Sequence, residues 1–206
     1  MNLPTEKQCL DYFEQYKVPK NIFQHCLKVR EVAMFLAQEL KKSGMKVNFE
    51  LLDCLALLHD LFKAATLKQI GQSRFHPYQH TPEEIEALEE LKKKYPHKYE
   101  GEIAYEVFKD QYPELALSLK NCSDPNSEHP NNEEKIAHYA DVRVFKEEVI
   151  LLHDRFQYLR EAYPKPIEYW DIFEEKNRKL EEQLFKELSF KPVELKDKLE
   201  IYKRNN

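Results

Sequence analysis

The sequence predicts an all-α fold that forms one compact domain, and three observations support this class. Only 3 of the 206 residues are glycine. Leucine, glutamate and lysine, which favour helices, are abundant. The apolar residues recur at the three- and four-residue intervals of amphipathic helices. A chain of this length buries a sizeable core without disulfides or a structural metal, so a single domain is expected.

The expected helices follow one another along the chain. The first spans 4–16, where Thr5 and Gln8 have the spacing of a helix cap. The second carries an apolar stripe from Ile22 to Leu40, and the third begins at Phe49. Further helices are expected at 82–95, 99–109, 113–121, 134–142, 149–163 and 170–190.

Local signals also divide the chain into a helical domain, one long loop and a tail. Thr81, Pro82 and Glu84 combine an N-cap residue, proline at the first helical position and an acid at the third. Before them, residues 64–80 contain glycine, proline and aromatics, which predicts an irregular loop able to cover a site. The domain is expected to span 1–190, with 191–206 as a loosely packed C-terminal extension.

Composition narrows the possible partners and location. The net charge is −5 and acids alternate with bases, which argues against an extended nucleic-acid surface but permits a small anionic substrate. No glycine-rich loop is present to hold a phosphate by its backbone. The 4 scattered cysteines fit a reducing compartment, and the sequence has neither an apolar signal core nor a membrane-length apolar run. We expect a cytoplasmic protein that does not enter a membrane.

One stretch organises the predicted site. From Leu51 to Lys63 the chain is almost continuously apolar, and near its end stand His59 and Asp60. A helix that is apolar on nearly every side is buried on nearly every side, which places this pair at the bottom of a cavity or inside the core. An ionised carboxylate is costly there unless it is paired or bound to a metal.

Two other helices offer matching groups. His25 lies at the edge of the apolar stripe of the second helix, and Asp141 flanks an inward face formed by Ile136 and Ala140. Two imidazoles and two carboxylates suit a divalent metal ion whose shell is completed by water. The competing interpretation is a set of buried polar residues that bond only to one another or to the backbone.

The order of these residues resembles the HD superfamily of metal-dependent phosphohydrolases. The segment Val18–Val29 resembles the opening helix of that family, and Ala56–Lys63 is similar to its signature helix, with lysine at a position where many members have it. Glu134–Asp141 resembles the helix that carries the last aspartate. The resemblance covers about the first three quarters of the chain.

This resemblance implies a single HD-domain helical bundle, of the type called HDIG, that hydrolyses a small phosphorylated molecule. A nucleotide is the expected substrate. It also implies one divalent ion, which could be Mn, Fe, Co, Ni, Zn or Mg, bound by His25, His59, Asp60 and Asp141.

The sequence departs from two other branches of the family. Members with two metals have further histidines where this chain has Tyr99 and Asn121–Cys122, so a single ion is expected. The nucleotidase branch carries glutamate where this chain has Lys63, which argues against that particular activity.

Within this scheme Asp60 and Lys63 are the candidate catalytic residues. Asp60 could accept a proton from the attacking water, and Lys63, one turn beyond His59, could hold the substrate phosphate. A lysine that extends from a helix end into solvent is an equally good interpretation of Lys63.

Three further residues are weaker candidates for substrate binding. His76 and His80, in the aromatic loop, could donate a proton or stack on a base, although exposed loop histidines are commoner. Arg143 could bind phosphate or form an ordinary salt bridge. The second His-Asp pair, at 153–154, is expected at the surface, and His129 and His138 are not candidates.

Two other functions remain open. The first is a catalytically degenerate HD module that binds metal and recognises a nucleotide or protein partner without turnover. The second is a purely structural helical protein. The sequence leaves the oligomeric state undecided.

Overall fold

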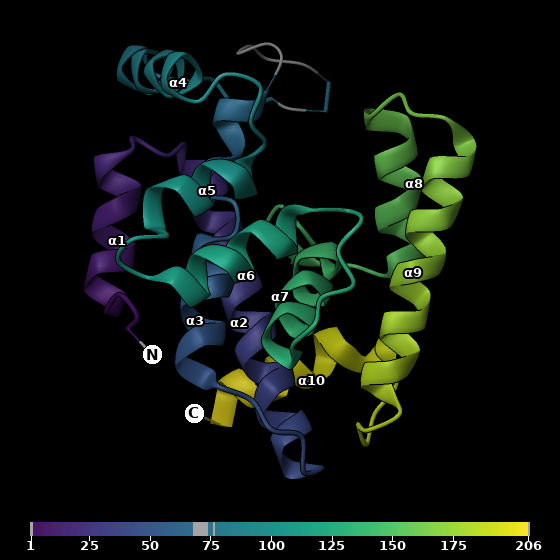
Figure 1. Ribbon diagram of the computed structural model, residues 1–206. Helices are drawn as coiled ribbons and strands as arrows, with labels where there is room; N and C mark the ends of the chain where they lie inside the picture. The colour runs from purple at the N-terminus through teal and green to yellow at the C-terminus, as the bar shows by residue number, and fades with distance from the viewer. Residues whose placement is uncertain (1, 68–73, 76, 206) are drawn as a thin grey trace.

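The fold is almost entirely helical, as the sequence predicts (Figure 1). The computed structural model describes residues 2–67, 74–75 and 77–205. The α-helices in this part of the chain are α1 Glu6–Gln15, α2 Lys20–Lys42, α3 Phe49–Leu58, α4 Pro82–Lys94, α5 Glu100–Phe108, α6 Pro113–Ser123, α7 Asn132–Arg143, α8 Leu152–Ala162, α9 Ile167–Phe185 and α10 Leu195–Asn205. Two 3-10 helices, η1 Lys63–Thr66 and η2 Pro192–Glu194, and an antiparallel pair of short strands, β1 Val144–Phe145 and β2 Glu148–Val149, join them.

Helix starts follow the capping signals of the sequence. The Thr5 hydroxyl accepts the backbone N–H of Gln8, and the Gln8 side chain accepts the backbone N–H of Thr5. Thr81 and Glu84 form the same reciprocal pair at the start of α4. Each pair satisfies backbone donors that a helix start leaves free, so these two boundaries are set locally.

The centre of the fold consists of α2, α3 and α7, which pack against one another. In α3 every residue from Leu51 to Leu58 except Asp53 is buried, as expected for a helix that is apolar on nearly every side. Helix α6 packs on both α3 and α7 and pairs with α5, and the hairpin of α8 and α9 packs on another part of α7, at the right of Figure 1. The carboxyl end of α3 therefore lies among three layers of helices.

The C-terminal segment corrects one expectation. Residues 191–206 were expected to be loosely packed, but Leu195 and Leu199 are fully buried and α10 packs against α2. The ring of Tyr202 lies 5.3 Å from that of Phe35, measured between centroids. Leu195, Leu199 and Tyr202 fall about one turn apart on one face of α10, and this face attaches the segment to the core.

No helix in the described ranges is both long enough and apolar enough to cross a membrane.

Candidate metal centre

The four predicted ligands come from three packed helices. His25 lies on α2, His59 directly follows the last residue of α3, Asp60 is next to it, and Asp141 lies near the end of α7. His59 still has helical backbone angles, but the chain turns after it instead of continuing as a helix to Lys63. This early end of α3 points the His-Asp pair toward α2 and α7.

The side chains of these residues converge. The Nε2 atom of His25 lies 3.0 Å from Oδ1 of Asp141 and 4.0 Å from Oδ2 of Asp60. The Nε2 atom of His59 lies 3.6 Å from the same Asp141 oxygen and 3.8 Å from Oδ2 of Asp60. One donor atom each from His25, His59 and Asp60 lies within 4.8 Å of the others, which is a spacing that a single ion can bridge.

The outer nitrogens of both imidazoles are held by backbone carbonyls. Nδ1 of His59 lies 2.8 Å from the carbonyl oxygen of Ala56, and Nδ1 of His25 lies 3.0 Å from that of Lys146. A ring that donates through Nδ1 presents a lone pair at Nε2, which is how second-shell carbonyls orient metal-binding histidines. Nε2 of His59 is buried and has no hydrogen-bond partner among the described residues.

The donor set therefore fits a divalent ion. A buried polar atom without a partner costs free energy, and here the atom is an imidazole nitrogen beside two carboxylates, where a metal ion could take the place of a proton. The unpartnered Nε2 of His59 also argues against a cluster of residues that only bond to one another. Its distance of 3.6 Å to Asp141 is too long for a hydrogen bond.

Charge in the cluster follows from burial and proximity. Burial of His59 favours its neutral form, but the carboxylates of Asp60 and Asp141 outweigh this and raise its pKa to about 9. Burial likewise opposes ionisation of Asp141, yet His25 and His59 hold the pKa of that carboxyl well below its usual range. The centre thus has an electrostatic environment that attracts positive charge.

Lys63 lies beside this cluster. Its Nζ donates a hydrogen bond of 2.5 Å to Oε1 of Glu100 and lies 3.9 Å from Oδ1 of Asp60. Burial lowers the pKa of Lys63, but Asp60 and Glu100 more than offset this and raise it above its ordinary value. Glu100 is a buried residue at the start of α5 that the sequence analysis missed, because its spacing along the chain carries no sign of this contact.

Two more residues that the sequence did not suggest approach the same region. Burial raises the pKa of Tyr163, the charges of Lys63 and Arg155 lower it, and the charge of Asp60 raises it. Arg155 lies over the rings of Phe145 and Tyr158, and its Nε is buried without a hydrogen-bond partner in the described ranges.

Of the two loop histidines that are candidates for substrate binding, the structure describes only His80. His80 is half-buried and its ring lies 5.1 Å from that of Tyr78, whose hydroxyl donates to Glu84 of α4. This contact places the His80 ring beside Tyr78 near the start of α4, and Nδ1 of His80 is buried without a hydrogen-bond partner among the described residues. A role of His80 in substrate binding stays a prediction. His76 lies outside the described residues. His153 and Asp154 are exposed on α8, as expected.

Arg143 is corrected from a candidate phosphate ligand to a structural residue. Its side chain is only 2% exposed. The guanidinium donates to the carbonyls of Ile150 and Pro192, to the hydroxyl of Tyr139 and to the carboxylate of Glu181. With its donors engaged by the protein, Arg143 ties the end of α7 to β2, α9 and the C-terminal segment.

Comparison with known proteins identifies a family over this same region. The sequence model of the HD domain matches residues 22–144, the interval that contains all four converging residues. The chain is also 34% identical over 128 residues to uncharacterized protein MJ0778 of Methanocaldococcus jannaschii, an alignment that covers 61% of this chain and 68% of that protein. No solved structure matches the chain.

Proposed function

Because this chain belongs to the HD domain family, we propose that it is a metal-dependent phosphohydrolase that cleaves a phosphate ester of a small molecule, with a nucleotide as the substrate class. The observation that carries the proposal is the unpartnered Nε2 of buried His59, which faces two carboxylates and a second imidazole. This combination of donors is suited to a divalent ion with an open position for water.

The proposed ligands are His25, His59, Asp60 and Asp141, around one ion chosen from Mn, Fe, Co, Ni, Zn or Mg. When bound, such an ion supplies Lewis acidity toward a phosphoryl oxygen and lowers the pKa of water. We propose one ion and not two, because this chain has Tyr99 and Asn121 at positions where two-metal members of the family have histidine. The Tyr99 hydroxyl donates to the carbonyl of Lys120, and Asn121 donates to Glu134, so both have structural partners.

Residues of the chain then perform the proton transfer and hold the substrate. Oδ2 of Asp60 faces the imidazoles while Oδ1 faces Lys63, which leaves one oxygen to accept a proton from the attacking water. The ammonium of Lys63 binds a non-bridging oxygen of the substrate phosphate and offsets the charge that develops there. Glu100 keeps Lys63 at this edge of the cluster.

The test combines metal analysis with a substrate screen. Purified protein is analysed for bound metals, and phosphate release is then measured with phosphomonoesters, phosphodiesters and nucleotides. The proposal expects about one ion per chain, and turnover that chelation abolishes and the same ion restores. A retained ion without turnover of any substrate would instead support an HD module that only binds a nucleotide or protein partner. A folded protein that binds no ion would leave a purely structural role.

A further inference from the structure

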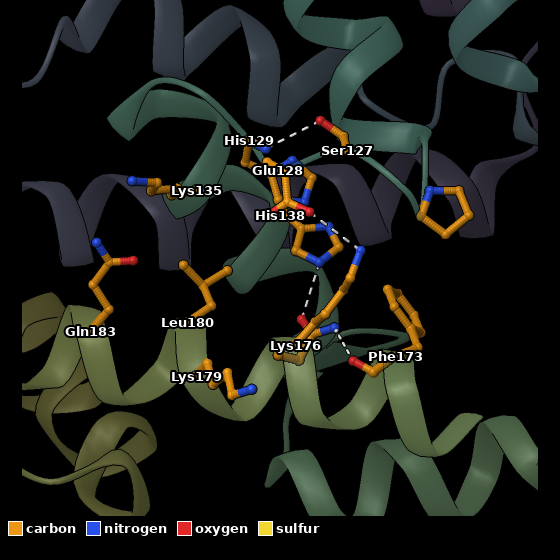
Figure 2. A pocket seen from close by; sticks show the side chains of 12 residues that line it. Ser127, Glu128, His129, Lys135, His138, Phe173, Lys176, Lys179, Leu180 and Gln183 are labelled. Atoms are coloured by element: carbon orange, nitrogen blue, oxygen red, sulfur yellow. Dashed lines mark hydrogen bonds and ion pairs between the residues drawn. The ribbon is translucent and has the colours of Figure 1, made fainter. Parts of the chain in front are cut away.

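A pocket lies between α7 and α9, and His138 in its wall is one helical turn along α7 from Asp141. It has a volume of about 200 Å³. Figure 2 shows the side chains around it, contributed by α7, by α9 and by the loop before α7. The sequence gives no reason to nominate His129 or His138, but both line this pocket and each is only 8% exposed.

The two histidine rings stack, with 4.2 Å between centroids and 30° between planes. Nε2 of His138 lies 3.0 Å from Oδ1 of Asn177, whose amide nitrogen donates to the carbonyl of Phe173, as the dashed lines in Figure 2 show. Because the Asn177 amide nitrogen donates to Phe173, the atom that faces His138 is the amide oxygen, which can only accept. His138 therefore donates through Nε2. Nδ1 of His129, in contrast, is buried and has no hydrogen-bond partner in the part of the chain that the structure describes.

Positive charge surrounds this pair. Lys135 of α7 and Lys176 and Lys179 of α9 line the pocket, and Glu128 is the one acid among its lining residues. Nζ of Lys176 lies 3.6 Å from Oε1 of Glu128, but the Glu128 side chain is 88% exposed, so water screens this pair. Nζ of Lys179 also lies 3.3 Å from Oε1 of Glu175, which does not line the pocket. Three lysines against one acid still give the lining residues an excess of positive charge.

The pKa of His129 reflects the same positive charge. Burial is the main reason why the pKa of His129 falls to about 3, and nearby His138, Lys176 and Lys135 lower it further. These contributions show that both lysines lie close enough to act on the ring. A negatively charged ligand would offset this field and could give the unpartnered ring nitrogen a partner.

We propose that this pocket binds a small phosphate-bearing anion, separately from the metal centre. Lysine ammoniums from two helices are point-charge donors suited to phosphate oxygens. The ring of His129, when its proton is on Nδ1, and the hydroxyl of Ser127 add neutral donors at the wall. The anion could be free inorganic phosphate or the phosphate group of a nucleotide, since both present the same oxygens.

Calorimetric titration of the full-length protein tests this site. Inorganic phosphate, pyrophosphate and AMP are titrated separately at a constant ionic strength of about 0.15 M. The test variant, K135Q/K176Q, removes two charges from the pocket. The control, K186Q, removes a lysine that is exposed just after α9 and does not line the pocket. A third variant, Asp60→Asn, alters the metal centre alone.

We expect at least one probe to bind the wild type, K186Q and Asp60→Asn with similar affinity, and to bind K135Q/K176Q at least about tenfold more weakly. Tighter binding of phosphate or pyrophosphate would identify an inorganic ligand, and tighter binding of AMP a nucleotide. Circular dichroism checks the fold, and K176Q alone serves as a milder variant.

Three results would overturn the proposal. The first is that no probe binds at concentrations up to about 10 mM. The second is binding that neither K135Q/K176Q nor K176Q weakens. The third is binding that Asp60→Asn alone abolishes, because the anion would then occupy the metal centre. None of these results bears on turnover, so the phosphohydrolase proposal is tested independently.

Discussion

The metal centre and the His129 pocket both include residues of α7, and each contains a histidine buried to the same extent. The pKa values of these two histidines are shifted in opposite directions. His59 is 7% exposed and His129 is 8% exposed, and each has one buried ring nitrogen without a hydrogen-bond partner among the described residues. Yet the pKa of His59 is raised to about 9, whereas that of His129 is lowered to about 3.

The neighbours of each ring explain the difference. Burial disfavours the charged form of both histidines, but Asp60 and Asp141 outweigh it at His59, while Lys176 and Lys135 add to it at His129. Burial alone therefore does not determine what such a site binds. We therefore expect the carboxylates to favour a cation at the first region and the lysines to favour an anion at the second.

Loss of a carboxylate at the metal centre should have the strongest consequence. Asp60→Asn removes one proposed ligand charge, so bound metal should fall to near zero and phosphate release should drop at least about a hundredfold. The matched control is Asp154→Asn, in the exposed His-Asp pair of α8. Metal analysis and phosphate release measure both variants, and equal losses in the two would contradict the assignment.

A second substitution tests the helix that the two regions share. Arg143→Met removes a buried guanidinium and leaves the carboxylate of Glu181 without its cationic partner, although the Tyr139 hydroxyl still donates to it. The free energy of unfolding should fall by about 3 kcal/mol, as measured by urea denaturation. The folded variant should still bind metal. A loss of turnover without a loss of stability would return Arg143 to the substrate site.

The substitution Lys63→Gln separates substrate binding from metal binding at the first region. Metal content should stay unchanged, while kcat/KM falls by about ten- to a hundredfold because the substrate phosphate loses one cation. Lys98→Gln is the matched control, since Lys98 also pairs with a glutamate, Glu106 of α5. An unchanged kcat/KM in Lys63→Gln would show that Lys63 only fixes Glu100.

The smallest expected effect concerns the pH dependence of stability at the second region. The unfolded chain protonates His129 near its ordinary pKa of 6.5, but the folded protein cannot do so until about pH 3. Stability should therefore fall as the pH decreases below 6.5, and His129 should account for about 2 kcal/mol of this loss at pH 5.

His129→Asn should remove that part of the pH dependence, as measured by denaturant unfolding at pH 7 and pH 5. His153→Asn, on an exposed part of α8, is the control and should follow the wild type. If all three proteins lose stability in parallel, the protonation of His129 is not restricted by the fold.

Local patterns predicted most of the fold. The pairs Thr5–Gln8 and Thr81–Glu84 set helix starts through contacts three residues apart, which a sequence displays directly. The burial of α3 followed from its leucines. The packing of 191–206 was missed because the segment is short and charged, although Leu195 and Leu199 already mark an apolar face.

The candidate centre was predictable only in part. His25, His59, Asp60 and Asp141 could be nominated because each borders an apolar stripe, and the structure brings them together, while ligation itself stays a prediction. Residues whose role depends on distant partners were missed or misread.

Two residues illustrate that limit. Glu100 contacts Lys63 across 37 residues of sequence, and Arg143 contacts Pro192 across 49. No spacing rule links positions so far apart, because their contact depends on how whole helices pack.

The most direct test of the central claim is anomalous scattering from crystals of the full-length protein grown with manganese. We expect one strong peak about 2 Å from the inward atoms of His25, His59, Asp60 and Asp141, with the His129 pocket free of metal. Side chains that point apart with no peak between them, or a peak at His129 instead, would contradict the account.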